Sequence, residues 1–121
     1  MKQIITARTV LAGSELEEIQ NGAVVVEDGK VVKVVPAEQL TEEDRAQAEW
    51  LAFEDETVLP GLIEGHNHLS IDARKSNHLE ILGTATECKL TLLAEEGLYD
   101  DLLSGVTTVR CMGEKHDLDL K

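Results

Sequence analysis

Two histidines, His66 and His68, are the residues of this chain whose type and spacing favour chemistry. Side chains of a β-strand alternate between its faces, so residues one position apart project from the same face. Neutral imidazole nitrogen is a good ligand for zinc and similar divalent cations, and two adjacent rings can share one ion. A catalytic zinc usually takes three protein ligands and leaves one position for water. The pair therefore predicts half of a metal site, with the remaining ligands supplied from elsewhere.

The alternative for the pair is two polar residues at a strand end that bind no metal, since histidines also occur freely at such positions. His78 and His116 fit no ligand spacing and are expected at the surface. Asp72 could help to shape a substrate mouth, although the polarity of a loop explains it equally well. No catalytic or substrate-binding residue is assigned from the sequence.

Cys88 and Cys111 are far apart in the sequence and form no CxxC pair, which argues against a disulfide framework and against a zinc ribbon. Both are expected to be buried thiols. Aromatic residues make up 2% of the chain, too few for a large ligand pocket lined by rings from this chain alone.

The elements that must position the histidines begin with a mostly β region over residues 1–59. Residues 3–11 predict a strand. Residues 23–27 and 30–35 predict an antiparallel hairpin, because the Asp28-Gly29 turn between them accepts positive φ. Residues 37–48 have a helical composition, and residues 50–53 and 57–59 are expected to be short strands around an acidic turn at 54–56.

After Pro60 the pattern changes from β to α/β. Residues 61–69 predict the strand that carries the histidines, residues 70–77 a polar loop, residues 78–104 a helix and residues 106–110 a β-branched strand. The expected apolar face of the helix comprises Ala85, Cys88, Leu92, Tyr99, Leu102 and Leu103. This order is typical of a βαβ crossover, so the two strands should be parallel with the helix packed over them.

The excess of acidic residues argues against binding to nucleic acid or to anionic membranes. Eleven Lys and Arg residues against 24 Asp and Glu residues give a net charge of −13, which repels nucleic acid and anionic membrane surfaces. No segment has the composition of a signal peptide or the length of a membrane span, so we expect a soluble, cytoplasmic protein.

Two motifs resemble the amidohydrolase superfamily, in its imidazolonepropionase-like and Xaa-Pro dipeptidase-like branch. The stretch Val58-Leu59-Pro60-Gly61-Leu62-Ile63-Glu64-Gly65-His66-Asn67-His68-Leu69 looks like the family's first barrel strand, and Leu103-Ser104-Gly105-Val106-Thr107-Thr108-Val109-Arg110-Cys111-Met112-Gly113 looks like its second. The resemblance implies an α/β chain in which residues 1–59 are part of a small N-terminal β-sandwich. Residues 60–121 would then be the first strand-helix-strand unit of a (β/α)8 TIM barrel.

The resemblance also implies an activity. His66 and His68 match two metal ligands at the end of the first barrel strand, holding one or two divalent ions, with zinc as the expected metal. The metal lowers the pKa of a water molecule that attacks the C–N bond of a small amide, cyclic amide or dipeptide substrate. Glu64 and Cys111 stand where the family commonly has aspartate. A complete barrel needs about 250 residues, so we expect the N-terminal fragment of a longer hydrolase, inactive alone.

Two other functions stay open from the sequence. A fragment that has lost the chemistry could act as an oligomeric binding or structural module. Two parallel strands expose free edges, so such a chain is expected to form a homo-oligomer. A fragment with a structural role and no measurable activity is the third alternative.

Overall fold

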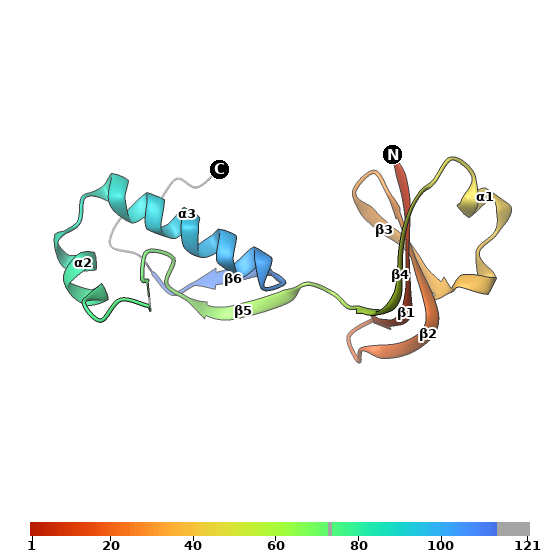
Figure 1. The fold of residues 1–121 in the computed structure, drawn as a ribbon, viewed down its shortest axis with the longest axis horizontal. Coiled ribbons are helices and arrows are strands. Elements are labelled where there is room, and N and C mark those ends of the chain that lie inside the picture. Colours follow the sequence, from red (N-terminus) through yellow and green to blue (C-terminus); the bar gives the residue numbers. More distant parts are fainter. Residues whose placement is uncertain (73, 114–121) are drawn as a thin grey trace. The chain divides into compact units, whose positions relative to one another are not determined.

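The computed structural model describes residues 1–72 and 74–113 of the 121-residue chain (Figure 1). The chain divides into two compact units, residues 1–60 and residues 61–121. In the described part of the chain, no helix is both long enough and apolar enough to cross a membrane.

The first unit is built on one four-stranded sheet with the strand order β3-β2-β1-β4 (Figure 1). The strands are β1 (Lys2–Ala12), β2 (Glu17–Glu27), β3 (Lys30–Pro36) and β4 (Glu49–Val58). Strands β1 and β2 are antiparallel, as are β2 and β3, whereas β4 runs parallel to β1. The strand expected at 3–11 and the hairpin expected around residues 28 and 29 are confirmed.

The turn chemistry explains the hairpins. Asp28 and Gly29 both have positive φ, 49° and 77°, as a primed two-residue turn requires. A second turn between β1 and β2 uses positive φ at Gly13 and Leu16, 71° and 52°. It lets β2 begin at Glu17, six residues before the expected start at residue 23. Residues 17–21 are mostly polar, so the sequence pattern did not predict that they belong to the strand.

The connection from β3 to β4 is helical over only part of residues 37–48, whose composition favours helix. The structure has a short 3-10 helix η1 (Ala37–Gln39) and a single helical turn α1 (Glu42–Arg45). Thr41 and Asp44 form a capping box, in which each side chain accepts from the other residue's backbone N–H. The cap fixes the start of α1, but the chain leaves the helical conformation again at Ala46.

The acidic turn expected at 54–56 lies inside β4, which is one continuous strand. Ala7 pairs with Phe53 and Thr9 pairs with Thr57, so the two pairings leave two more residues between them on β4 than on β1. This bulge accommodates the acidic residues opposite Arg8, within an otherwise regular ladder. Pairing with β1 therefore overrides the local turn signal of three consecutive acidic residues.

The core of the first unit lies on both faces of the sheet. One cluster contains Ile4, Ala23, Val25 and Leu40, and a second contains Ala7, Val10 and Val24. Burial of these β-branched and aliphatic side chains supplies the main driving force for folding this unit.

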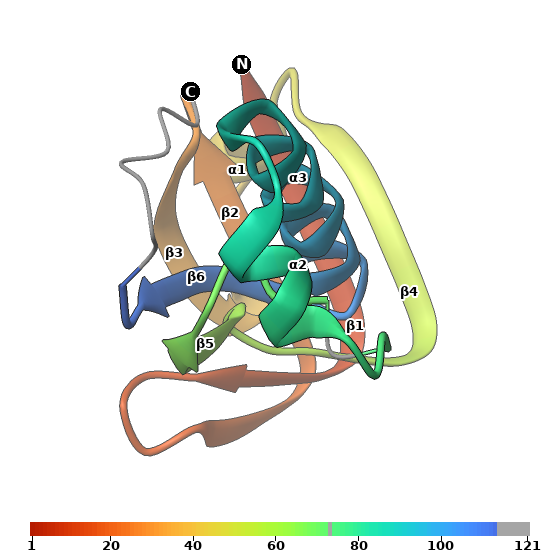
Figure 2. The same cartoon turned by 90° about the vertical axis from the view of Figure 1, so that its left-hand side faces the viewer.

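The second unit is a strand-helix-helix-strand arrangement. Its elements are β5 (Leu62–Asn67), α2 (His78–Thr84), α3 (Glu87–Leu103) and β6 (Val106–Cys111). Strands β5 and β6 are parallel, as expected for a crossover, and α3 contacts β6. Figures 1 and 2 show α3 lying over the two strands, with α2 as a separate helix.

The expected helix over 78–104 is split in two. Ala85 is extended and ends α2, and the side chain of Thr86 accepts a hydrogen bond from the backbone N–H of Lys89 to begin α3. The expected apolar face is also wrong, because α3 buries Leu90 and Ala94 whereas Leu92 and Tyr99 are exposed. A helix with apolar residues on several sides does not reveal its buried face from spacing alone.

Candidate functional site

The histidines lie at the carboxyl end of β5. His66 belongs to the strand, and His68 follows its last residue, Asn67. The two ring centroids are 5.4 Å apart, the ring planes are inclined by 65°, and both side chains are exposed. The structure therefore brings the two sequence-predicted residues together, although His68 lies just past the regular strand on which the alternation argument rested.

His68 has a defined ring contact. Its Nδ1 lies 3.2 Å from the backbone carbonyl oxygen of Gly113, just beyond β6. A carbonyl oxygen can only accept, so this hydrogen bond requires the tautomer that carries its proton on Nδ1. The lone pair of Nε2 is then free to bind a ligand, and the ring orientation is fixed by its partner.

Glu64 supports the backbone of His66. Its Oε1 accepts a hydrogen bond of 2.7 Å from the backbone N–H of His66. The pairing between β5 and β6 shifts register between Glu64 and Asn67, so the regular ladder is interrupted at His66. The carboxylate of Glu64 thus takes over a hydrogen bond in an irregular part of the strand. The sequence singled out Glu64 as a departure from the family but did not reveal this contact.

Asn67, between the two histidines, is tied to both neighbouring elements. Its side-chain amide donates to Asp101 Oδ2 of α3 at 2.9 Å, and its backbone carbonyl accepts from Met112 N at 2.8 Å. The contact with Asp101 spans 34 residues of sequence. Asn67 and Asp101 are site residues that the sequence reasoning missed, because nothing local signals a bond across a crossover.

Ion pairs connect the loop after the histidines, which contains Asp72, Arg74 and Lys75, to itself and to α3. Asp72 accepts from Arg74 Nε at 2.8 Å and lies 3.1 Å from Lys75 Nζ, and Arg74 also reaches Glu96 at 3.2 Å and Asp100 at 3.1 Å. Hydrogen bonds from Arg74 and then Lys75 lower the pKa of Asp72 to about 2, and Asp72 in turn raises the pKa of Arg74. Asp72 is therefore a carboxylate held by cations, and its expected role at a substrate mouth stays a prediction.

A cavity of about 310 Å³ adjoins the histidines. It is lined by residues from the end of β5, the following loop and α3: Glu64, His66, Asn67, His68, Leu69, Ile71, Gly97, Leu98 and Asp101. Two histidines and two acidic residues thus line one cavity. Such a mixture of polar and aliphatic lining suits a small polar ligand.

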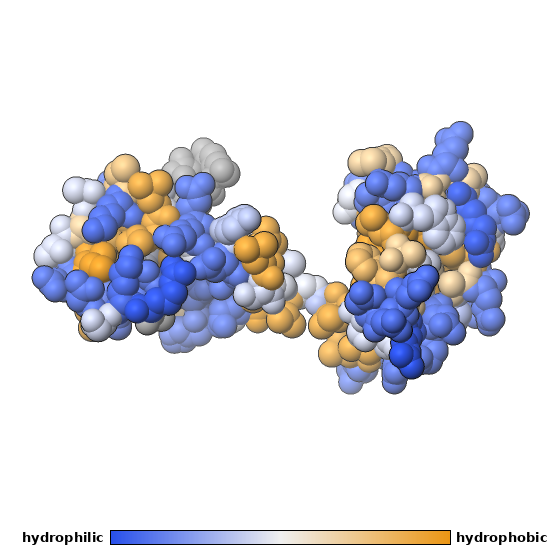
Figure 3. Space-filling model, viewed as in Figure 1, coloured by the Kyte–Doolittle hydropathy of each residue, from blue (hydrophilic) through white to orange (hydrophobic). Residues whose placement is uncertain are grey.

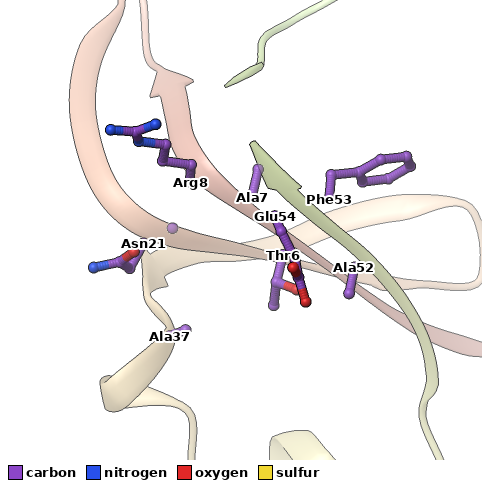
Figure 4. A pocket seen from close by; sticks show the side chains of 9 residues that line it. Thr6, Ala7, Arg8, Asn21, Ala37, Ala52, Phe53 and Glu54 are labelled. Carbon is purple, nitrogen blue, oxygen red and sulfur yellow. The ribbon is translucent and has the colours of Figure 1, made fainter. Parts of the chain in front are cut away.

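A second cavity, of about 260 Å³, lies on the sheet of the first unit (Figure 4). Its lining includes Arg8, Asn21, Phe53 and Glu54, beside small side chains of β1 and β4. Neither histidine nor cysteine lines it, and Figure 4 shows the charged ends of Arg8 and Glu54 pointing in different directions. Its chemistry is therefore less specific than that of the histidine cavity.

The remaining candidate ligands do not join the pair. Among the described residues, no three His, Cys, Asp or Glu side chains are grouped to hold a metal ion. His78 begins α2, and its Nδ1 contacts the carbonyl oxygen of Lys75 at 2.9 Å. His116 lies outside the described residues. Cys88 and Cys111 are both exposed, so the expectation of buried thiols is wrong.

The chain resembles known proteins in sequence and in fold, although no protein-family model matches it. It is 34% identical to an imidazolonepropionase of Geobacillus kaustophilus (strain HTA426) in an alignment covering 79% of this chain and 29% of that protein. The chain thus spans less than a third of the relative's length.

Two solved structures share the fold. A Xaa-Pro dipeptidase with bound methionine matches with a TM-score of 0.75 and 23% identity, over 94% of this chain and 27% of that one. A prolidase complexed with N-methylphosphonate-L-proline matches with a TM-score of 0.75 and 21% identity, over 93% and 26% respectively. In sequence and in fold, the chain therefore matches an N-terminal portion of proteins of the amidohydrolase superfamily.

Proposed function

We propose that this chain supplies two metal ligands, His66 and His68, to a hydrolase that cleaves the C–N bond of a small amide, cyclic amide or dipeptide. The observation that carries the proposal is the paired rings, 5.4 Å apart at the end of β5. The names of the similar proteins, an imidazolonepropionase and a Xaa-Pro dipeptidase, support this class of substrate.

The same proposal assigns the two halves of the chain. Residues 1–59 are the N-terminal portion of a small β-sandwich, and residues 60–121 are the first strand-helix-strand unit of a (β/α)8 barrel. The parallel pairing of β5 with β6 and the helix between them support the second assignment. In such barrels the active site lies at the carboxyl ends of the strands, which is where His66 and Asn67 end β5 and His68 follows.

The donor atoms suit a divalent cation of the zinc class. Imidazole nitrogen binds zinc at about 2.0–2.1 Å, so two nitrogens sharing one ion lie roughly 3.5 Å apart. Ring centroids separated by 5.4 Å are compatible with that spacing. The hydrogen bond from His68 Nδ1 to Gly113 leaves Nε2 as the ligand atom and has the form of the outer contacts that orient metal-binding histidines.

The chain's own residues would bind the metal ion and keep its two ligands in position. His66 and His68 present neutral nitrogens, Glu64 holds the backbone at His66, and Asn67 fixes the strand end against α3. A bound divalent cation supplies Lewis acidity, polarising a carbonyl and lowering the pKa of water. Two ligands make an open site, and further ligands complete it from outside the described residues.

A second candidate function is that of an oligomeric binding or structural module. Leu62 and Ile63 on β5 are 50% and 74% exposed, and Figure 3 shows apolar surface on the second unit. Within the described residues, the sheet of β5 and β6 has two strands, and an isolated two-stranded sheet is marginally stable. Association of copies would cover this apolar surface. Sedimentation of the chain over a range of concentrations tests this candidate.

Zinc titration of the 121-residue chain tests the proposed site. We expect weak zinc binding that is lost when His66 and His68 are both replaced by alanine, and that His78→Ala leaves unchanged. Each titration is followed by the imidazole signals in NMR spectra, with an amide and dipeptide substrate panel run in parallel. Equal zinc affinity in the wild type and the double variant would rule out this ligand assignment.

A further inference from the structure

The end of α3 carries two consecutive aspartates, Asp100 and Asp101, where a helix normally favours the opposite charge. The helix macrodipole is negative at its carboxyl end, so carboxylates there are unfavourable and cations are favourable. The last turn of α3 has no basic residue. Helix stability therefore does not explain either aspartate.

Tertiary contacts account for both residues. Asp101 accepts the hydrogen bond from the side chain of Asn67, which stands between the two histidines. Asp100 accepts from Arg74, in the loop that follows them. The last turn of α3 thus contacts the chain at two points, at Asn67 between the histidines and at Arg74 in the loop after them.

The histidine segment needs such support because the strand ladder is interrupted there. Between Glu64 and Asn67 the pairing with β6 shifts register. Beyond the shift, Asn67 pairs with Cys111 and β5 ends. Asn67 is half-buried, and its amide reaches a half-buried carboxylate, whereas the histidines on either side of it are exposed. A hydrogen bond to an ionised carboxylate is among the stronger kinds.

We infer that Asp101, through its hydrogen bond with Asn67, is a positioning residue that keeps the rings of His66 and His68 side by side. This inference rests on the proposed function for its metal-binding consequence, but the ring arrangement itself is independent of any metal. Asp101 touches neither ring in this role. It holds the side chain of Asn67, the residue that links His66 to His68 in the backbone.

The test uses substitutions in the 121-residue chain. Asn67→Ala removes the donor and Asp101→Ala removes the acceptor. Asp101→Asn keeps an acceptor oxygen, and the double variant N67D/D101N reverses donor and acceptor while preserving net charge. Glu95→Ala, which removes an exposed acid of α3, is the matched control for charge loss.

Two readouts separate positioning from metal binding. The first is the nuclear Overhauser effect between the two imidazole rings in the metal-free chain, and the second is zinc affinity. We expect both alanine variants to lose most of the inter-ring effect and to weaken zinc binding about tenfold, the lower end for loss of an outer contact. Asp101→Asn and N67D/D101N should retain the inter-ring effect, and Glu95→Ala should match the wild type.

The inference is overturned if Asn67→Ala and Asp101→Ala both leave the inter-ring effect unchanged, or if Glu95→Ala reduces it as much as Asp101→Ala does. If Asp101→Ala fails to fold, Asn67→Ala breaks the same bond from the strand side. A wild-type chain that shows the inter-ring effect but binds no zinc would contradict the proposed function while leaving this positioning role standing.

Discussion

The two units of the chain differ in the number of side chains that each one buries. The first buries seven apolar residues on its sheet: Ile4, Ala7, Val10, Ala23, Val24, Val25 and Leu40. Within the described residues, the second buries Leu90 and Ala94 and one polar residue, Ser70. Both units have ion pairs, and in the second these are the charge cluster at Arg74, beside the hydrogen bond between Asn67 and Asp101. The unit that carries the candidate chemistry therefore has fewer buried side chains to support its polar contacts than the first unit has.

The largest expected effect compares the same residue type in both units. Ile4 is 0% exposed and Ile63 is 74% exposed. Ile4→Ala should lower the free energy of unfolding by about 2–5 kcal/mol, because it leaves a cavity in a packed core. Ile63→Ala should change it by less than about 0.5 kcal/mol, as surface substitutions do. Urea unfolding measures both, and similar losses would mean that Ile63 is covered in solution.

Glycines at the start of the second unit give a smaller, equally matched test. A Cβ added at Gly61 would overlap the side chain of Thr107 on β6, whose own Cβ would lie 2.7 Å away. A Cβ at Gly65 would meet nothing within 4 Å, and Gly65 does not have positive φ. Gly61→Ala should therefore destabilise by about 1–3 kcal/mol through overpacking. Gly65→Ala should be neutral or slightly stabilising, because it restricts the unfolded chain.

Thermal unfolding of the two glycine variants distinguishes the close approach from a general need for glycine. Equal destabilisation by the two substitutions would contradict the close packing of the chain at Gly61 against β6.

The sequence predicted those parts of the fold that have a local cause. Asp28-Gly29 specifies a primed turn through its φ values, and the β-branched runs beside it specify the paired strands. The crossover from β5 to β6 followed from the order of the elements. The length of β4 and the start of β2 could not be predicted, because pairing with β1 decides both. Long-range pairing overrides local propensity in strands.

The candidate site was predictable in its residue types but not in its supports. The spacing of His66 and His68 identified the pair, and the structure places their rings together. The contacts of Glu64, Asn67 and Asp101 could not be predicted. The first depends on an interruption in the ladder, and the other two depend on where the last turn of α3 comes to lie.

The smallest expected effect is on the pH dependence of stability, and each unit offers one carboxyl group for it. In the first unit, hydrogen bonds from Lys33 and then from Thr41 lower the pKa of Asp44 from 3.8 to about 2. In the second, Arg74 and then Lys75 lower the pKa of Asp72 from 3.8 to about 2. A lowered pKa in the folded state means that the ionised form stabilises the fold. The contribution is complete well above pH 3.8, the ordinary pKa of both groups, and is lost as the pH falls towards about 2.

Asp44→Asn should therefore reduce the acid sensitivity of the first unit, and Asp72→Asn that of the second. Trp50, on β4, reports unfolding of the first unit by fluorescence, and Tyr99, on α3, reports on the second by NMR. Between pH 4 and pH 2 each variant should lose less stability than the wild type in its own unit and an unchanged amount in the other. Glu43→Gln, an exposed acid of α1, is the control for Asp44. Because the pKa of each carboxyl group is lowered from 3.8 to about 2, the two variants should change the acid sensitivity of their own units by similar amounts. An effect of Asp72→Asn on the first unit, or of Asp44→Asn on the second, would contradict the assignment of each ion pair to its own unit.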